Sequence, residues 1–206
     1  MPPRYILCKE LANKLLLKQD LTSLKTDICN LKHLKPLYIY TFDDYIKTIN
    51  INIDFGNEDG CTIKSKYVDV ILYKPNLLNV GRERWTICHE MGHIYIGHEE
   101  DNPENELEAD WFAASLLMPE ILLTAMSHRL KLNGKFISKI FGVSTEAALI
   151  RLNYINNLKT YGTTFEFFDS ILLEKQYDNM IKECNDFHNI KTISMMKRIK
   201  HININK

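Results

Sequence analysis

Residues 85–96 read Trp85-Thr86-Ile87-Cys88-His89-Glu90-Met91-Gly92-His93-Ile94-Tyr95-Ile96. If this stretch is a helix, His89 and His93 lie on one face, about one turn apart. Two imidazoles at that spacing can bind one Zn²⁺ at about 2.0–2.1 Å. Glu90 follows the first histidine, where its carboxylate can reach a water molecule beside the metal rather than the metal itself. The stretch therefore predicts metal-assisted hydrolysis, with His89 and His93 as ligands and Glu90 as general base.

The residues around this motif favour a buried helix. Apolar side chains surround the histidine pair, which is not typical of a helix that faces water on all sides. Gly81 and the charged residues 82–84 open the expected helix, and Gly97 is placed to end it. Cys88 could be a nucleophile, but we expect a thiol packed in the core.

Composition limits the other classes of protein. The chain has 206 residues, of which 45% are hydrophobic, and Lys and Arg balance Asp and Glu at 26 each. A formal charge of zero gives no general attraction to nucleic acid or to membranes. The five cysteines are scattered and odd in number, which favours reduced thiols over a disulfide framework. No signal peptide and no long apolar span is recognisable, so we expect a cytoplasmic protein with no membrane partner.

The N-terminal part alternates between helical and extended patterns. Leucines at helical spacing predict helices over residues 5–18 and 21–34, and Pro36 would stop the second. Residues 37–42 are β-branched and aromatic and predict a strand. Asp43 is placed to cap a short helix after it.

A small sheet is expected before the motif. Residues 57–60 read Asn-Glu-Asp-Gly, a turn signal that predicts a hairpin between residues 51–55 and 61–66. Residues 68–73 predict one further strand. This last strand could be the edge along which an extended substrate binds, or it could simply wall the core, and the sequence favours neither.

A second helix, over residues 104–118, offers the third metal ligand. Glu106 and Asp110 fall on its apolar side, where a buried acid needs a cation beside it. Glu108 falls on the side that looks solvated, so its replacement should change zinc binding no more than a few-fold. We therefore expect Glu106 as third ligand and Asp110 as the residue that orients a ligand imidazole. His98 lies beyond the first helix and is expected at the surface.

Two separated motifs resemble one family. His-Glu-x-Gly-His, followed by Glu-x-x-Ala-Asp-x-Phe-Ala-Ala-x-Leu-Leu-Met-Pro at residues 106–119, is similar to the ImmA/IrrE-type metallopeptidases. The resemblance covers roughly residues 65–155. It implies an enzyme that cleaves a helix-turn-helix repressor, often that of a phage or mobile element, and so derepresses genes. The protein partner would be that repressor.

The C-terminal part is expected to be helical. Residues 136–153 have the apolar spacing and central glycine of a helix-turn-helix. The second helix would read DNA in a DNA-binding protein, but it is mostly apolar, so a packing hairpin that frames the active site is favoured. Residues 165–187 predict another helix, and the basic tail 191–206 is expected to be a frayed terminus.

These patterns together predict an α+β fold, in which a small antiparallel or mixed sheet packs on the helix with the HExxH motif. A helical part with the helix-turn-helix-like hairpin follows. We expect a zincin-like metallopeptidase domain over residues 1–158 and a helical extension over 159–206. The predicted function is zinc-dependent endopeptidase, with an oxyanion-stabilising Tyr or His further along the chain. The alternatives are a non-catalytic module that binds a repressor and a DNA-binding regulator, although direct nucleic-acid binding is not expected.

Overall fold

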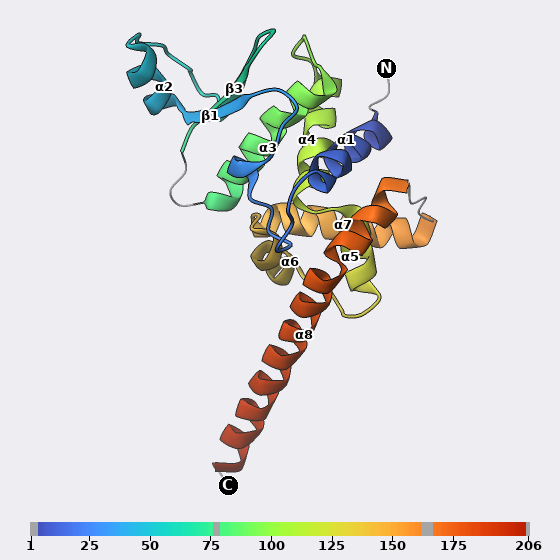
Figure 1. The fold of residues 1–206 in the computed structure, drawn as a ribbon. Coiled ribbons are helices and arrows are strands. Elements are labelled where there is room, and N and C mark those ends of the chain that lie inside the picture. Colours follow the sequence, from blue (N-terminus) through green and yellow to red (C-terminus); the bar gives the residue numbers. More distant parts are fainter. Residues whose placement is uncertain (1–3, 76–78, 162–166, 205–206) are drawn as a thin grey trace.

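The computed structural model describes residues 4–75, 79–161 and 167–204, and the side chains of these residues except 159–161 and 189–204. Its elements, in chain order, are α1 (Tyr5–Leu17), η1 (Ile28–Asn30), β1 (Leu37–Thr41), α2 (Phe42–Ile49), β2 (Gly60–Lys64), β3 (Asp69–Tyr73), α3 (Val80–Ile96), α4 (Pro103–Leu117), α5 (Glu120–Ser127), α6 (Gly134–Phe141), α7 (Thr145–Tyr161) and α8 (Phe167–Ile204) (Figure 1).

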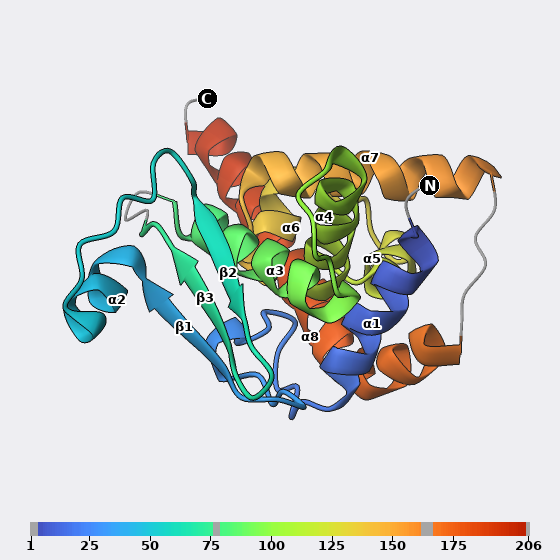
Figure 2. The ribbon, with the colours of Figure 1, turned by 90° about the horizontal axis from the view of Figure 1, so that it is seen from above.

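The strands form one mixed sheet in the order β1-β3-β2. β1 runs parallel to β3, with Leu37 opposite Asp69, and α2 supplies part of the crossover that parallel strands require. β2 runs antiparallel to β3, with Gly60 opposite Tyr73. Helix α3 packs against β2 and β3, α2 lies beside β1 at the end of the sheet, and the other α-helices lie on the far side of α3 (Figure 2). The predicted α+β fold, with a small sheet against the motif helix, is confirmed.

The predicted hairpin is wrong in its partner. Residues 51–55 form no strand, and β2 pairs instead with β3. A tight turn closes this pair, because the hydroxyl of Ser65 donates to the carbonyl of Val68 at 2.6 Å and accepts from its amide at 3.1 Å. The strand that follows this turn is therefore central, and the sheet edge beside α3 is β2 rather than residues 68–73.

The predicted helix over residues 21–34 is also wrong, since only η1 is helical there. The side chain of Gln19 donates to the carbonyl of Leu15 at 2.8 Å and accepts from the amide of Lys32 at 2.7 Å, which closes the segment into a loop. Lys175 of α8 donates to the carbonyl of Leu17, the last residue of α1, and to that of Gln19. These bonds take the place of α-helical ones, and three apolar side chains become buried without an α-helix (Leu24, Ile28 and Leu31).

The two motif helices begin and end as their sequences require. Asn79 caps α3 by accepting from the amide of Arg82 at 3.1 Å, and Gly97 ends it with φ 83°, a conformation that suits glycine. Asn102 caps α4 ahead of a proline at its first position. At α2 the cap is Thr41 and not the predicted Asp43, because the strand ends one residue earlier than expected.

Helices α6 and α7 form the predicted helix-turn-helix-like hairpin, with Gly142 between them at φ 66°. Helix α8 packs on α1 and α5, and its Asp169 is buried against Lys9 at 3.0 Å and Asn13 at 2.8 Å. The first half of α8 is thus continuous with the main core, while the predicted boundary at residue 158 stays a prediction. The predicted helix start at Phe165 lies outside the described residues, as do the side chains of the basic tail. The predicted helix end at residue 187 and the frayed tail are wrong, since α8 continues to Ile204.

No single helix in the described part of the chain is long and apolar enough to cross a membrane. Helices α4 and α5 pass that criterion only together, across a bend of 53°.

Candidate metal centre

Three side chains from α3 and α4 converge on one point. Nε2 of His89 lies 3.0 Å from Nε2 of His93. Oε2 of Glu106 lies 3.1 Å from the first nitrogen, and Oε1 of Glu106 lies 3.2 Å from the second. Four ligands arranged tetrahedrally at zinc bond lengths lie about 3.3 Å apart. The two nitrogens and the carboxylate group are therefore already about as far apart as three ligands of one zinc ion. In the described part of the chain this group has three members and no fourth.

The other nitrogen of each imidazole has its own partner. Nδ1 of His89 lies 2.8 Å from a carboxylate oxygen of Asp110, as predicted for an orienting residue. Nδ1 of His93 lies 3.0 Å from Nδ1 of His98. A histidine that binds metal through Nε2 must carry its ring proton on Nδ1. Both rings have an acceptor at Nδ1, so both Nε2 atoms can be unprotonated. Their lone pairs then face the point that they share with Glu106.

His98 belongs to a buried chain of contacts, and its predicted surface position is wrong. Its Nε2 lies 3.1 Å from Glu108, which in turn accepts from the guanidinium of Arg4 at 2.7 Å. His98 therefore donates from Nε2 to the carboxylate and accepts at Nδ1 from His93. The contacts with Arg4 and His98 lower the pKa of Glu108 to about 2, although burial opposes this.

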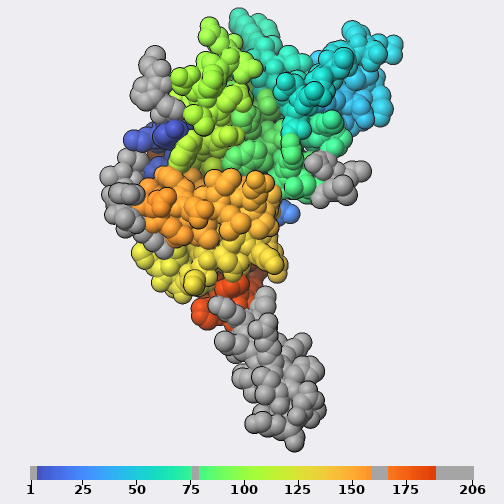
Figure 3. All heavy atoms as spheres, turned by 180° about the vertical axis from the view of Figure 1, so that it is seen from behind, coloured from blue at the N-terminus to red at the C-terminus, as the bar shows by residue number. Residues whose placement is uncertain are grey.

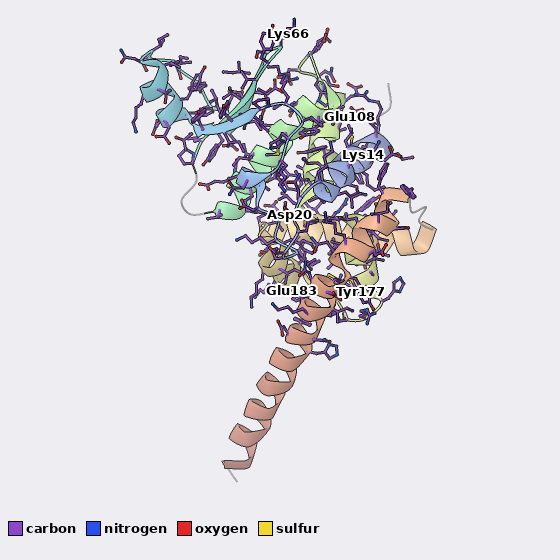
Figure 4. All side chains as sticks on the ribbon, in the orientation of Figure 1. Lys14, Asp20, Lys66, Glu108, Tyr177 and Glu183 are labelled. Carbon is purple, nitrogen blue, oxygen red and sulfur yellow. The ribbon has the colours of Figure 1, made fainter. Side chains whose placement is uncertain are left out.

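The predicted solvated position of Glu108 is wrong as well, since the side chain is buried (Figure 4). The pattern of apolar residues along α4 did not predict this burial, because α1 covers that side of α4 and Arg4, just before α1, contacts Glu108. No signal within the helix marks Glu108, because its partners Arg4 and His98 both lie outside α4.

Glu90 is placed for proton transfer. It is buried on α3 beside the edge strand β2, and a Cβ on Gly60 would lie 3.2 Å from its Oε1. A side chain larger than hydrogen at residue 60 would therefore crowd it. Burial, with a contribution from the charge of Glu106, raises the pKa of Glu90 to about 7 against the opposing effect of His89. A carboxylate with a pKa near neutrality can both take and return a proton at physiological pH.

Without a metal, His89 and His93 titrate differently from each other. Burial, together with the charges of His89 and His98, lowers the pKa of His93 to about 4. Burial also opposes the charged form of His89, but its hydrogen bond to Asp110 and the charges of Asp110 and Glu90 outweigh this and raise its pKa. His93 is thus neutral and ready to bind at neutral pH, whereas protons compete more strongly at His89.

A polar cavity of about 1130 Å³ lies over these residues, between α3 and the edge strand β2. Its lining includes the ligand residues, Glu90 and, on β2, Gly60, Cys61, Thr62 and Lys64. Tyr154, one of the downstream residues considered as oxyanion stabiliser, lies in a neighbouring cavity, where its hydroxyl donates to Glu120 at 3.2 Å. Cys88 is a core thiol, as predicted, and burial raises its pKa to about 12.

Residues 45–153 match the family model described as the IrrE N-terminal-like domain, a family of peptidases. The match spans more than half of the chain, so the protein belongs to this family, which supports a metallopeptidase. The matched range contains His89, Glu90, His93, Glu106 and Asp110, all of α6 and the first part of α7. No curated protein matches the chain.

Proposed function

We propose that the protein is a zinc-dependent endopeptidase in which His89, His93 and Glu106 bind Zn²⁺. The observation that carries the proposal is the convergence of two Nε2 atoms and one carboxylate, with both Nδ1 atoms held by other residues. A structural zinc site closes with four protein ligands, whereas three ligands leave a position open for chemistry.

When bound, Zn²⁺ supplies Lewis acidity, which polarises a carbonyl and makes water a stronger acid. Glu90 takes the proton from the attacking water and passes it to the leaving amine nitrogen, so that the same carboxylate serves as base and then as acid. Asp110 and His98 hold the two imidazoles in the orientation and tautomer that binding requires. The edge strand β2 offers unpaired backbone groups along which an extended peptide can align.

We further propose a substrate, on the strength of the family resemblance: a helix-turn-helix repressor of a phage or mobile element. The hairpin α6–α7 does not favour DNA binding by this chain itself. Arg151, the arginine of its second helix, is buried and donates to the carbonyl of Met118 at 3.1 Å, so it is not available to a base or a phosphate.

The test is co-expression of the full chain with the regulator encoded beside it, followed by mass spectrometry of the regulator. Wild-type protein should produce two fragments whose new termini lie on either side of one cleaved peptide bond, and the Glu90→Gln variant should produce none. An intact regulator that co-purifies with wild-type protein and zinc would instead identify a non-catalytic binding module.

A further inference from the structure

A second cavity, of about 580 Å³, adjoins the candidate metal centre. It lies between three helices, and most of its wall area is apolar. The apolar wall comes from Trp85 of α3, Leu107, Trp111 and Ala114 of α4, and Ala147 and Ile150 of α7. Charged side chains of both signs, among them Asp59, Arg82 and Glu146, complete the lining. Its size is in the range of small-molecule and side-chain binding pockets. In Figure 3, α7 lies directly against α4 and α3 on this side of the molecule.

The two cavities share part of their walls. Asp59, Trp85 and Thr86 line both of them. Asp110, which holds His89, also lines the second cavity. A ligand in the apolar cavity therefore lies next to any group bound at the metal centre.

Two apolar side chains of the cavity wall are exposed to solvent, and a third is held in place by its neighbours. Ile150 is 66% exposed and Leu107 is 46% exposed, so both have apolar surface left to bury. The ring of Trp111 is held from behind, edge to face on Tyr154 at 4.7 Å and against the guanidinium of Arg151 at 5.7 Å. A wall that is already ordered loses little entropy when a ligand binds.

The edge strand gives the cavity a position along the substrate. β2 runs from Gly60, which lies beside Thr86 and Glu90, to Lys64, which donates to the carbonyl of His98. A peptide that pairs antiparallel to β2 passes the metal centre and then reaches Asp59, at the apolar cavity. Antiparallel pairing is the more stable arrangement. The residue that follows the cleaved bond then lies nearest this cavity.

We infer that the cavity between α3, α4 and α7 binds a large apolar side chain of the substrate, that of the residue immediately after the cleaved bond. The inference rests on the proposed function. It gives the helix-turn-helix-like hairpin a task, because α7 supplies Ala147 and Ile150 to the wall. The hairpin then selects substrates by side chain instead of reading DNA.

The test uses two series of peptide hydroxamates and the zinc-loaded full chain. In the first series the variable side chain lies on the C-terminal side of the metal-binding hydroxamate, and in the second on its N-terminal side. The variable groups are hydrogen, methyl, isobutyl, benzyl and carboxymethyl. The chain has two tryptophans, Trp85 and Trp111, and both line the cavity, so their fluorescence reports occupancy without any cleavage.

In the first series, isobutyl and benzyl compounds should bind roughly 10- to 100-fold more tightly than the hydrogen compound, and carboxymethyl should bring no gain. Ala147→Leu, which fills the cavity, should remove this ratio. Leu149→Ala is the matched control on the same helix, since Leu149 is 47% exposed, packs near Gly134 and does not line the cavity. It should keep the ratio.

Equal affinity across the first series would overturn the inference while leaving the metal centre intact. A preference confined to the second series would also overturn it, because the cavity would then serve the other side of the cleaved bond. Failure of every hydroxamate to bind the zinc-loaded chain would reject the metal centre of the proposed function, and the inference with it.

Discussion

Gly92 of α3 lies against Ala109 of α4 so closely that no side chain fits between them. A Cβ on Gly92 would lie 2.8 Å from the Cα of Ala109 and 3.1 Å from its carbonyl oxygen. The glycine is the residue before a ligand histidine, and Ala109 lies between Glu106 and Asp110. This contact therefore sets how near the acids of α4 come to the histidines of α3.

Gly92→Ala should weaken zinc binding and destabilise the fold by about 1–3 kcal/mol, because the obstructing atoms are backbone and α4 must move. A loss of stability would be informative, because replacing glycine by alanine in an ordinary helix interior raises the free energy of unfolding by about 1 kcal/mol. Thermal unfolding and a chelator competition assay would measure both effects. A more stable variant with unchanged zinc affinity would show that the helices are not held by this contact.

Glu106→Ala should lower zinc affinity by orders of magnitude, because two protein ligands hold the metal poorly. The control is Glu104→Ala, which removes an exposed acid two residues earlier on the same helix. Competition with a chromophoric chelator ranks the two variants. Equal affinity of the two would place the third ligand elsewhere.

The sequence correctly predicted that His89, His93, Glu106 and Asp110 come together, but it misplaced the residues around them, and the reason is the range of the interactions. The histidines, Glu90, Glu106 and Asp110 lie on two neighbouring helices, so helical geometry alone brings them to one side. His98 and Glu108 were misplaced because their environment depends on Arg4, about a hundred residues away in the chain. The spacing of apolar residues within one helix cannot predict a contact with such a distant residue.

The errors in the sheet have the same origin. The predicted hairpin between residues 51–55 and 61–66 rested on the turn signal between them. That signal could not show that residues 61–66 pair instead with the strand that follows them. The Ser65–Val68 turn settles the pairing in the structure. The loop over residues 21–34 likewise follows from the distant Lys175 and from Gln19, although its leucine spacing is helical.

His98→Phe should lower zinc affinity by about 10- to 100-fold, the usual effect of losing a residue that orients a metal ligand. Phenylalanine fills the space of the imidazole but cannot accept from Nδ1 of His93. The matched control is His33→Phe, which loses a 2.7 Å contact with the Tyr95 hydroxyl and touches no ligand. The sequence predicted that replacing Glu108 changes zinc binding no more than a few-fold. The structure changes that expectation: Glu108→Ala should weaken zinc binding, because Glu108 holds His98. Zinc affinities within two-fold for both histidine variants would refute the positioning role.

Glu90→Gln should keep the fold and the zinc content while lowering the cleavage rate by about 10²- to 10⁴-fold, the usual effect of removing a general base. Glutamine has nearly the same shape but accepts no proton. Elemental analysis and a cleavage assay on the same preparation separate the two properties. Cleavage by this variant at the wild-type rate would contradict the proposed mechanism.

The same variant gives a prediction for the metal-free protein that does not involve catalysis. The folded pKa of Glu90 is about 7 and the reference value is 4.5, so between these pH values the unfolded chain releases a proton that the folded chain keeps. The stability of the wild type should therefore fall as the pH rises from about 4.5 to about 7, and then level off. Glu90→Gln lacks this titration, so its stability relative to the wild type should rise over that window by on the order of 1–3 kcal/mol.

Denaturant unfolding at several pH values with a chelator present would measure this difference in stability, with Glu104→Gln as control for the change in net charge. A difference that stays constant from pH 4.5 to 8 would mean that the buried carboxylate is as easily ionised as in the unfolded chain, and one that shrinks would mean that His89 stabilises its charge.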